Sequence, residues 1–91
     1  MAAVEAQDWG TAVAAFRRLA EANPKDGNAW HMLGYTLHAD GKLDEALKIH
    51  IKATEFAGVA PTAAYNAACV HALKGDKEQA LSWLAKAVDF G

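Results

Sequence analysis

The chain has 91 residues, two prolines, one cysteine and a formal net charge of −2, which fits a single domain. Hydrophobic residues make up 53% and charged residues 22%, which excludes an intrinsically disordered chain. The apolar runs are too short to span a membrane, and nine Lys and Arg against eleven Asp and Glu provide no basic surface for nucleic acid. The lone Cys69 and the absence of a signal-peptide pattern in residues 1–10 lead us to expect a cytoplasmic location.

Hydrophobic periodicity and helix breakers predict five helices and no strand. The first ends before Pro24, which cannot continue a helix, and Asp26 can cap the second. Gly41 and Gly75 end the second and fourth helices, since glycine readily adopts positive φ. The predicted ranges are 8–23, 27–39, 43–57, 61–74 and 77–90, and residues 2–6 can add a short turn.

The sequence repeats itself at an offset of 34 residues. The shared order is Gly, then Ala-Leu, then Lys-Ala, then Phe, with constant spacing in both copies. The identical pairs are Ala29/Ala63, Gly41/Gly75, Ala46/Ala80, Leu47/Leu81, Lys52/Lys86, Ala53/Ala87 and Phe56/Phe90. Two predicted helices in each 34-residue period indicate a stack of helix pairs.

The middle copy reads Trp30-x2-Leu33-Gly34-x2-Leu37, followed by Ala46-x3-His50 and Ala53. This pattern resembles the tetratricopeptide repeat (TPR) family, although Leu37 and His71 stand where Tyr is usual and Gly58 where Pro is usual. The resemblance implies an all-α, right-handed α-solenoid of antiparallel helix pairs with about two and a half repeats. The single domain, 1–91, would then comprise a partial first repeat (1–26), a second repeat (27–60) and an uncapped third repeat (61–91).

The small residues of each copy, Gly34 and Ala46 among them, are expected where helices cross closely. Trp30 is expected to be buried between neighbouring pairs. His50 and His71 occupy positions where the family has aromatic residues, so we expect packed, hydrogen-bonded imidazoles there.

No set of residues predicts an enzyme, a metal site or a cofactor site. His31 and His38 are seven residues apart, about 10 Å along a helix, which is too far to chelate one ion. Cys69 has apolar neighbours in sequence and is interpreted as a packing residue, not a reactive thiol. Glycine-rich phosphate loops and nucleophile motifs are absent from the sequence.

In TPR proteins the first helix of each pair lines a concave groove. The resemblance implies that the predicted helices 27–39 and 61–74 line this groove here. The expected groove residues are Asn28, His31, Tyr35, His38, Thr62, Tyr65, Asn66 and Cys69. Aromatic and neutral hydrogen-bonding side chains suit an extended peptide, so the predicted function is a protein–protein interaction module with a scaffold or adaptor role. The Lys and Arg clamp with which some TPR domains hold the acidic C-terminus of heat-shock chaperones is missing.

A structural or self-assembly role is the alternative, with the open ends of the solenoid as the working surface. The expected self-association edge is at the N-terminal end and comprises Val4, Val13, Phe16 and Leu19. Such an apolar edge predicts a weak homodimer, and the open ends also fit a fragment of a longer protein.

Overall fold

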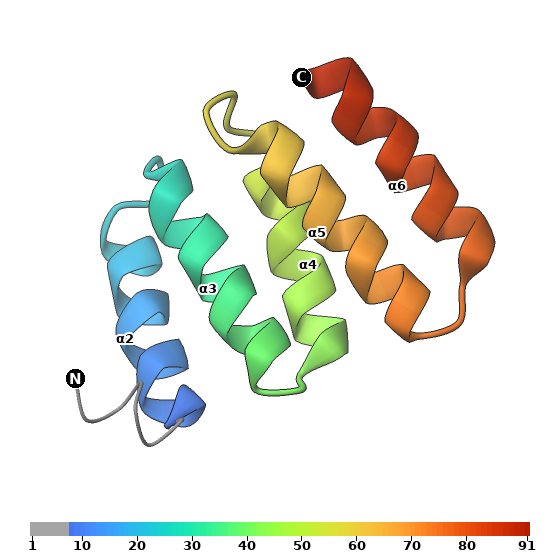
Figure 1. Cartoon of the computed structure of the whole chain (residues 1–91). Helices are drawn as coiled ribbons and strands as arrows, with labels where there is room; N and C mark the ends of the chain where they lie inside the picture. The colour runs from blue at the N-terminus through green and yellow to red at the C-terminus, as the bar shows by residue number, and fades with distance from the viewer. Residues whose placement is uncertain (1–7) are drawn as a thin grey trace.

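The computed structural model describes residues 8–91, and every regular element in this range is an α-helix. Consecutive helices run antiparallel and stack into a layered arrangement of 36 × 28 × 18 Å (Figure 1). The helices are α2 (Trp9–Ala22), α3 (Gly27–Ala39), α4 (Leu43–Ala53), α5 (Ala60–Leu73) and α6 (Lys77–Phe90). The turn expected at residues 2–6 lies outside the described residues, within which no helix is long and apolar enough to cross a membrane.

The helix ends follow local chemistry. Asp8, Asp26 and Asp76 each accept a hydrogen bond from a backbone N–H in the first turn of the helix that follows. Gly41 and Gly75 have φ values of 79° and 81°, the left-handed conformation that closes α3 and α5.

The predicted third helix, 43–57, was too long, because α4 ends at Ala53. The backbone N–H groups of Thr54, Glu55 and Phe56 each donate to the carbonyl three residues earlier, which tightens the chain into turns. The turn brings Phe56 against Gly27, where an added Cβ would lie 2.6 Å from the Cβ of Phe56. The packing of Phe56 on α3 therefore ends the helix before its apolar periodicity does.

The core lies between α3, α4 and α5, where Leu33, Leu37 and Val70 are fully buried. Alanines fill the crossings, including Ala46, which is fully buried. These small side chains let the helix backbones approach closely, as expected from the repeat pattern.

Trp30 is only half-buried, contrary to the expectation of a buried indole. Its Nε1–H donates to the Pro24 carbonyl at 2.8 Å, and the Lys52 ammonium lies 5.1 Å from the centre of the ring. The polar edge of the indole thus stays at the surface while its body packs against the core.

Candidate peptide-binding groove

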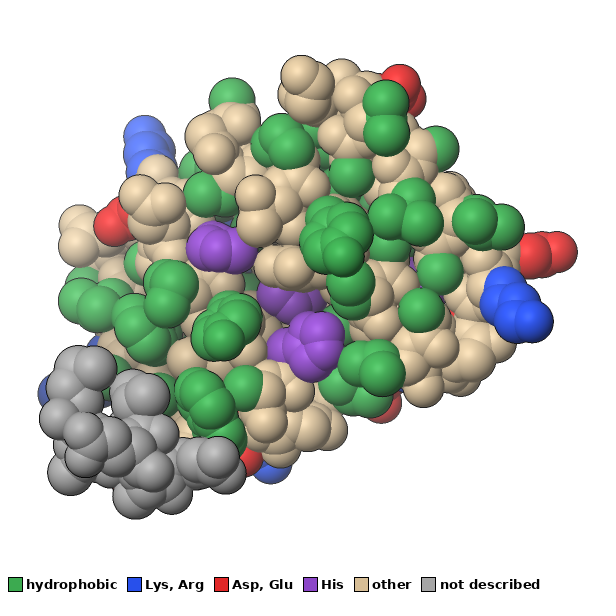
Figure 2. Space-filling model, in the orientation of Figure 1, with side chains coloured by type: hydrophobic (Ala, Val, Ile, Leu, Met, Phe, Trp, Pro, Cys, Tyr) green, Lys and Arg blue, Asp and Glu red, His purple; other side chains and the backbone are tan. Residues whose placement is uncertain are grey.

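Helices α3 and α5 lie beside each other on the face of the molecule that is toward the viewer in Figure 1, with α4 behind them. Figure 2 shows histidine side chains gathered at the middle of this face among hydrophobic ones, while the charged side chains lie toward its periphery. The face is therefore neutral and mixed in polarity.

A hollow of about 300 Å³ lies between the two helices. Tyr35, His38 and Ala39 of α3 line one side, and Asn66 and Cys69 of α5 line the other. We call this hollow the α3–α5 groove. Four of its five lining residues are among the expected groove residues. The fifth, Ala39, was not expected, because its side chain is neither polar nor aromatic.

Tyr35 is the most accessible large side chain of the groove, with 52% of its surface exposed. Its ring meets the Trp9 ring edge to face, with centroids 6.4 Å apart and an angle of 81° between the planes. This contact holds the tyrosine from α2, the preceding helix. Trp9 was not among the expected groove residues, because it lies on α2 and not on the two helices to which the groove was assigned.

His50 of α4 packs beneath α3, and its side chain is fully buried. An added Cβ on Gly34 would lie 2.6 Å from Nδ1 of His50, so glycine at this position makes room for the imidazole. The His38 ring, which lines the groove, stands edge to face with His50 at 6.1 Å between centroids. His50 therefore supports the α3 side of the groove from within the core.

The expected hydrogen bond of His50 is wrong: neither ring nitrogen has a partner among residues 8–91. Burial, and to a smaller extent the nearby His38 and His31, lowers the pKa of His50 to about 4. His50 is thus a neutral imidazole at pH 7. His71 is half-buried, as expected for a packed side chain, but its Nδ1 lies 3.9 Å from a carboxylate oxygen of Asp76, which is too long for the expected hydrogen bond.

The remaining expected groove residues do not line the α3–α5 groove. Thr62 and Tyr65 line a separate hollow that α5 forms with α6. Asn28 is exposed near the start of α3 and lines hollows on either side of that helix end. His31 is half-buried, and its Nδ1 has no hydrogen-bond partner within the described range.

The expected self-association edge is only partly at the surface. Val13 is 9% exposed and belongs to the core, and Phe16 packs against that core. Leu19 is 52% exposed, and Val4 lies outside the described residues. The edge is therefore narrower than the sequence predicted, because α3 covers much of the apolar side of α2.

Within residues 8–91, no group of three or more His, Cys, Asp or Glu side chains could hold a metal ion. Cys69 is a half-buried free thiol at the wall of the groove.

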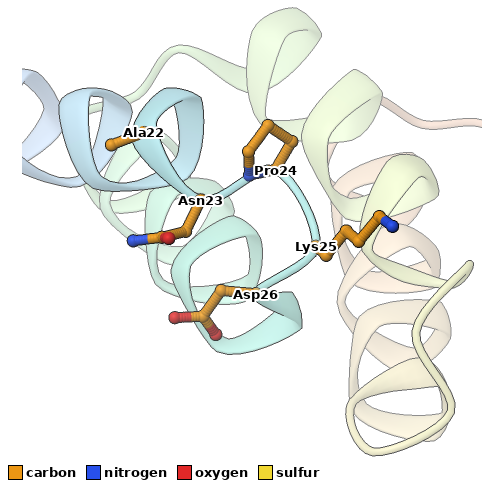
Figure 3. A pocket seen from close by; sticks show the side chains of 5 residues that line it. All are labelled: Ala22, Asn23, Pro24, Lys25 and Asp26. Atoms are coloured by element: carbon orange, nitrogen blue, oxygen red, sulfur yellow. The ribbon is translucent and has the colours of Figure 1, made fainter.

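A hollow of about 640 Å³, larger than the α3–α5 groove, lies at the connection between α2 and α3 (Figure 3). Its lining side chains point in different directions and do not converge on one place. Asp26 accepts from the N–H groups of Asn28 and Ala29, and the Pro24 carbonyl accepts from Trp30. These polar groups complete the turn, so we do not place the functional site here.

Comparison with protein families matches two models, both described as tetratricopeptide repeat, over residues 1–58 and 61–90. The chain belongs to the tetratricopeptide repeat family. Its helical repeat architecture is that of a TPR solenoid, and TPR domains are protein-interaction modules.

Among solved structures, the TPR domain is similar to YrrB, described as a TPR protein with an unusual peptide-binding site. The two chains are 34% identical, with a TM-score of 0.86. The match covers 97% of this chain and 45% of the YrrB chain, so this TPR domain spans less than half the length of that relative. No curated protein matches the sequence.

Proposed function

We propose that the α3–α5 groove binds a short extended peptide segment of a partner protein, which gives this TPR domain a scaffold or adaptor role without catalysis. The observation that carries the proposal is the groove itself, about 300 Å³, with exposed Tyr35 on one side and half-buried Asn66 on the other. We also propose a cytoplasmic location, because a single cysteine, Cys69, fits a reducing compartment.

The groove can recognise both the backbone and the side chains of an extended peptide. The side-chain amide of Asn66 both donates and accepts, which suits a peptide bond, and the Tyr35 ring can cover an apolar side chain. Because Trp9 already holds Tyr35 by an edge-to-face contact, less side-chain freedom is lost on binding.

The groove favours a neutral peptide over an acidic one. None of its five lining residues is Lys or Arg. A peptide carboxylate would have to leave water without a cationic partner in the hollow, which is costly. This distinguishes the groove from the cationic clamps that hold acidic C-termini in some TPR domains.

The test selects binders from a displayed peptide library and measures their affinities by fluorescence anisotropy. Tyr35→Ala should weaken binding by about 1–3 kcal/mol, as for an aromatic anchor. Tyr65→Ala is the matched control, since Tyr65 is equally exposed, at 54%, but lines a different hollow; its effect should be below about 0.5 kcal/mol. Equal effects of the two substitutions would mean that the peptide does not sit in the α3–α5 groove.

Cys69 provides an independent readout, because it lines the groove and is the sole cysteine of the chain. Saturating peptide should slow alkylation of Cys69 by iodoacetamide at least several-fold. An unchanged rate with bound peptide would place the binding surface elsewhere.

A further inference from the structure

Three histidines come together at the α3–α5 groove. His38 lines the groove, and its ring stands edge to face with the ring of His50, with 6.1 Å between the centroids. His31 lies close enough to His50 to act on it electrostatically, as His38 does. We call His31, His38 and His50 the histidine cluster, and Figure 2 shows histidine side chains at the middle of this face. The groove thus lies over side chains that can take up protons.

Burial divides the histidine cluster into a member that stays neutral and a member that can carry charge. His50 is fully buried, and burial is the largest cause that lowers its pKa to about 4. His38 is half-buried and borders the open hollow, where water can solvate a charge. Histidine ordinarily gains a proton between about pH 8 and about pH 5, whereas tyrosine and cysteine ionise at higher pH. Mild acidification therefore adds charge at the wall of the groove before it reaches the core.

The groups that face His38 offer no carboxylate to such a charge. His50 faces it from α4, and Asn66 and Cys69 line the opposite wall from α5. Asp40 follows His38 by two residues, a spacing at which side chains on a helix do not face each other. Several charged side chains of the neighbouring helices instead lie beside one another: Arg17 with Glu45, Lys74 with Asp44, Lys52 with Glu55, and His71 with Asp76. None of the five residues that line the groove is Asp or Glu, so an acidic partner for His38 has to come from a ligand.

We propose that acidification changes the class of peptide that the α3–α5 groove selects, from neutral segments to segments that place an Asp or Glu side chain beside His38. This inference rests on the proposed peptide-binding function and adds regulation to the same site. At neutral pH the hollow has no cationic partner for a carboxylate. Protonated His38 supplies that partner, because an imidazolium and a carboxylate form a charge-assisted hydrogen bond.

The neutral His50 confines this response to the groove. Because His50 takes up no proton until about pH 4, a protonated His38 has no like charge on the ring 6.1 Å away. Binding and protonation then favour each other: an acidic peptide stabilises the protonated form of His38, so the complex takes up a proton as it forms. A neutral peptide offers no carboxylate and gains nothing from the imidazolium.

Paired peptides test this change of preference. A neutral, amidated peptide selected against the domain at about pH 7.5 is substituted at each position in turn with Glu and, separately, with uncharged Gln. Affinities are measured by fluorescence anisotropy at about pH 7.5 and about pH 5.8, where a Glu side chain stays ionised. At the position beside His38, the affinity of the Glu peptide relative to its Gln partner should rise at least about threefold at the lower pH, as for a partly exposed ion pair.

Two variants assign the effect to one residue. His38→Gln should abolish the rise, since glutamine forms hydrogen bonds but does not titrate. His31→Gln is the matched control, because His31 belongs to the histidine cluster but does not line the groove, and it should retain the rise. Calorimetry at about pH 6.5 in buffers of different ionisation enthalpy should detect proton uptake with the Glu peptide, and none in His38→Gln. Far-UV circular dichroism at both pH values checks that each variant is folded.

The outcomes separate this inference from the proposed function. Equal weakening by Tyr35→Ala and Tyr65→Ala removes the α3–α5 groove as the peptide site, and the change of preference with it. Binding that depends on Tyr35 but shows neither a gain for any Glu peptide nor proton uptake leaves the groove in place and overturns this inference. A gain that survives His38→Gln, or that disappears in His31→Gln, overturns the assignment to His38.

Discussion

Acidification should destabilise this domain through one buried side chain, His50. Its imidazole is fully buried, and neither ring nitrogen is hydrogen-bonded within the described part of the chain. Burial, followed by the neighbouring His38 and His31, lowers the pKa of His50 to about 4 from its ordinary 6.5. Protonation of His50 therefore opposes folding.

The sign and the size of the effect follow from these two pKa values. As the pH falls through 6.5, the unfolded chain binds a proton at His50 while the folded chain stays neutral until about pH 4. The contribution of the neutral imidazole to the free energy of unfolding is fully present above pH 6.5 and is lost as the pH falls from 6.5 to about 4. The full loss is about 3 kcal/mol, of which about 2 kcal/mol has gone by pH 5. For a domain of this size, that lowers the melting temperature by roughly 10 °C.

Urea unfolding followed by far-UV circular dichroism between about pH 7.5 and about pH 5 measures this loss. His50→Leu should remove most of it, because leucine stands at the corresponding position of the next repeat, Leu84, and does not titrate. His71→Gln is the control: this histidine is half-buried beside Asp76, and its replacement should leave the acid loss in place. Equal pH slopes for the wild type and His50→Leu would refute the reasoning.

Two further predictions concern local packing and capping. Gly34→Ala should destabilise the domain by about 1–3 kcal/mol in urea unfolding, because the new Cβ would lie 2.6 Å from His50, whereas Gly58→Ala meets no atom within 4 Å and should be nearly neutral. Asp26→Ala should cost about 1 kcal/mol in the same assay, since Asp26 caps α3; Lys42→Ala, at the start of α4 where no side chain caps the helix, should cost less than about 0.5 kcal/mol. Similar losses for both members of either pair would contradict the packing or the capping argument.

The positions of the helices could be predicted from the sequence because short-range chemistry decides them. Pro24 ends α2, Asp26 and Asp76 cap the helices that follow, and Gly41 and Gly75 turn with positive φ. Each of these effects acts over four residues or fewer, so it can be recognised without knowledge of the tertiary structure. The 34-residue repeat then determined that these helices stack in pairs.

The shape of the binding face was decided by tertiary packing. Tyr35 and Tyr65 were expected in one groove, yet Tyr35 lines the hollow with Asn66, whereas Tyr65 lines a separate hollow with Leu84. Which hollow a side chain enters depends on how closely two helices approach, and that distance depends on residues of both helices. The sequence of a single helix therefore does not determine the distance between that helix and its neighbour.

Contacts across the stack also decided the outcomes that sequence analysis missed. The packing of Phe56 on Gly27 ends α4 at Ala53, although the apolar pattern continues beyond it. His50 is buried without a hydrogen bond because Gly34 leaves room for its ring and residues 8–91 bring no polar group to its nitrogens. Local sequence thus determines where each helix begins and, for most of them, where it ends, whereas the close fit between helices determines which side chains are covered and which remain free to bind.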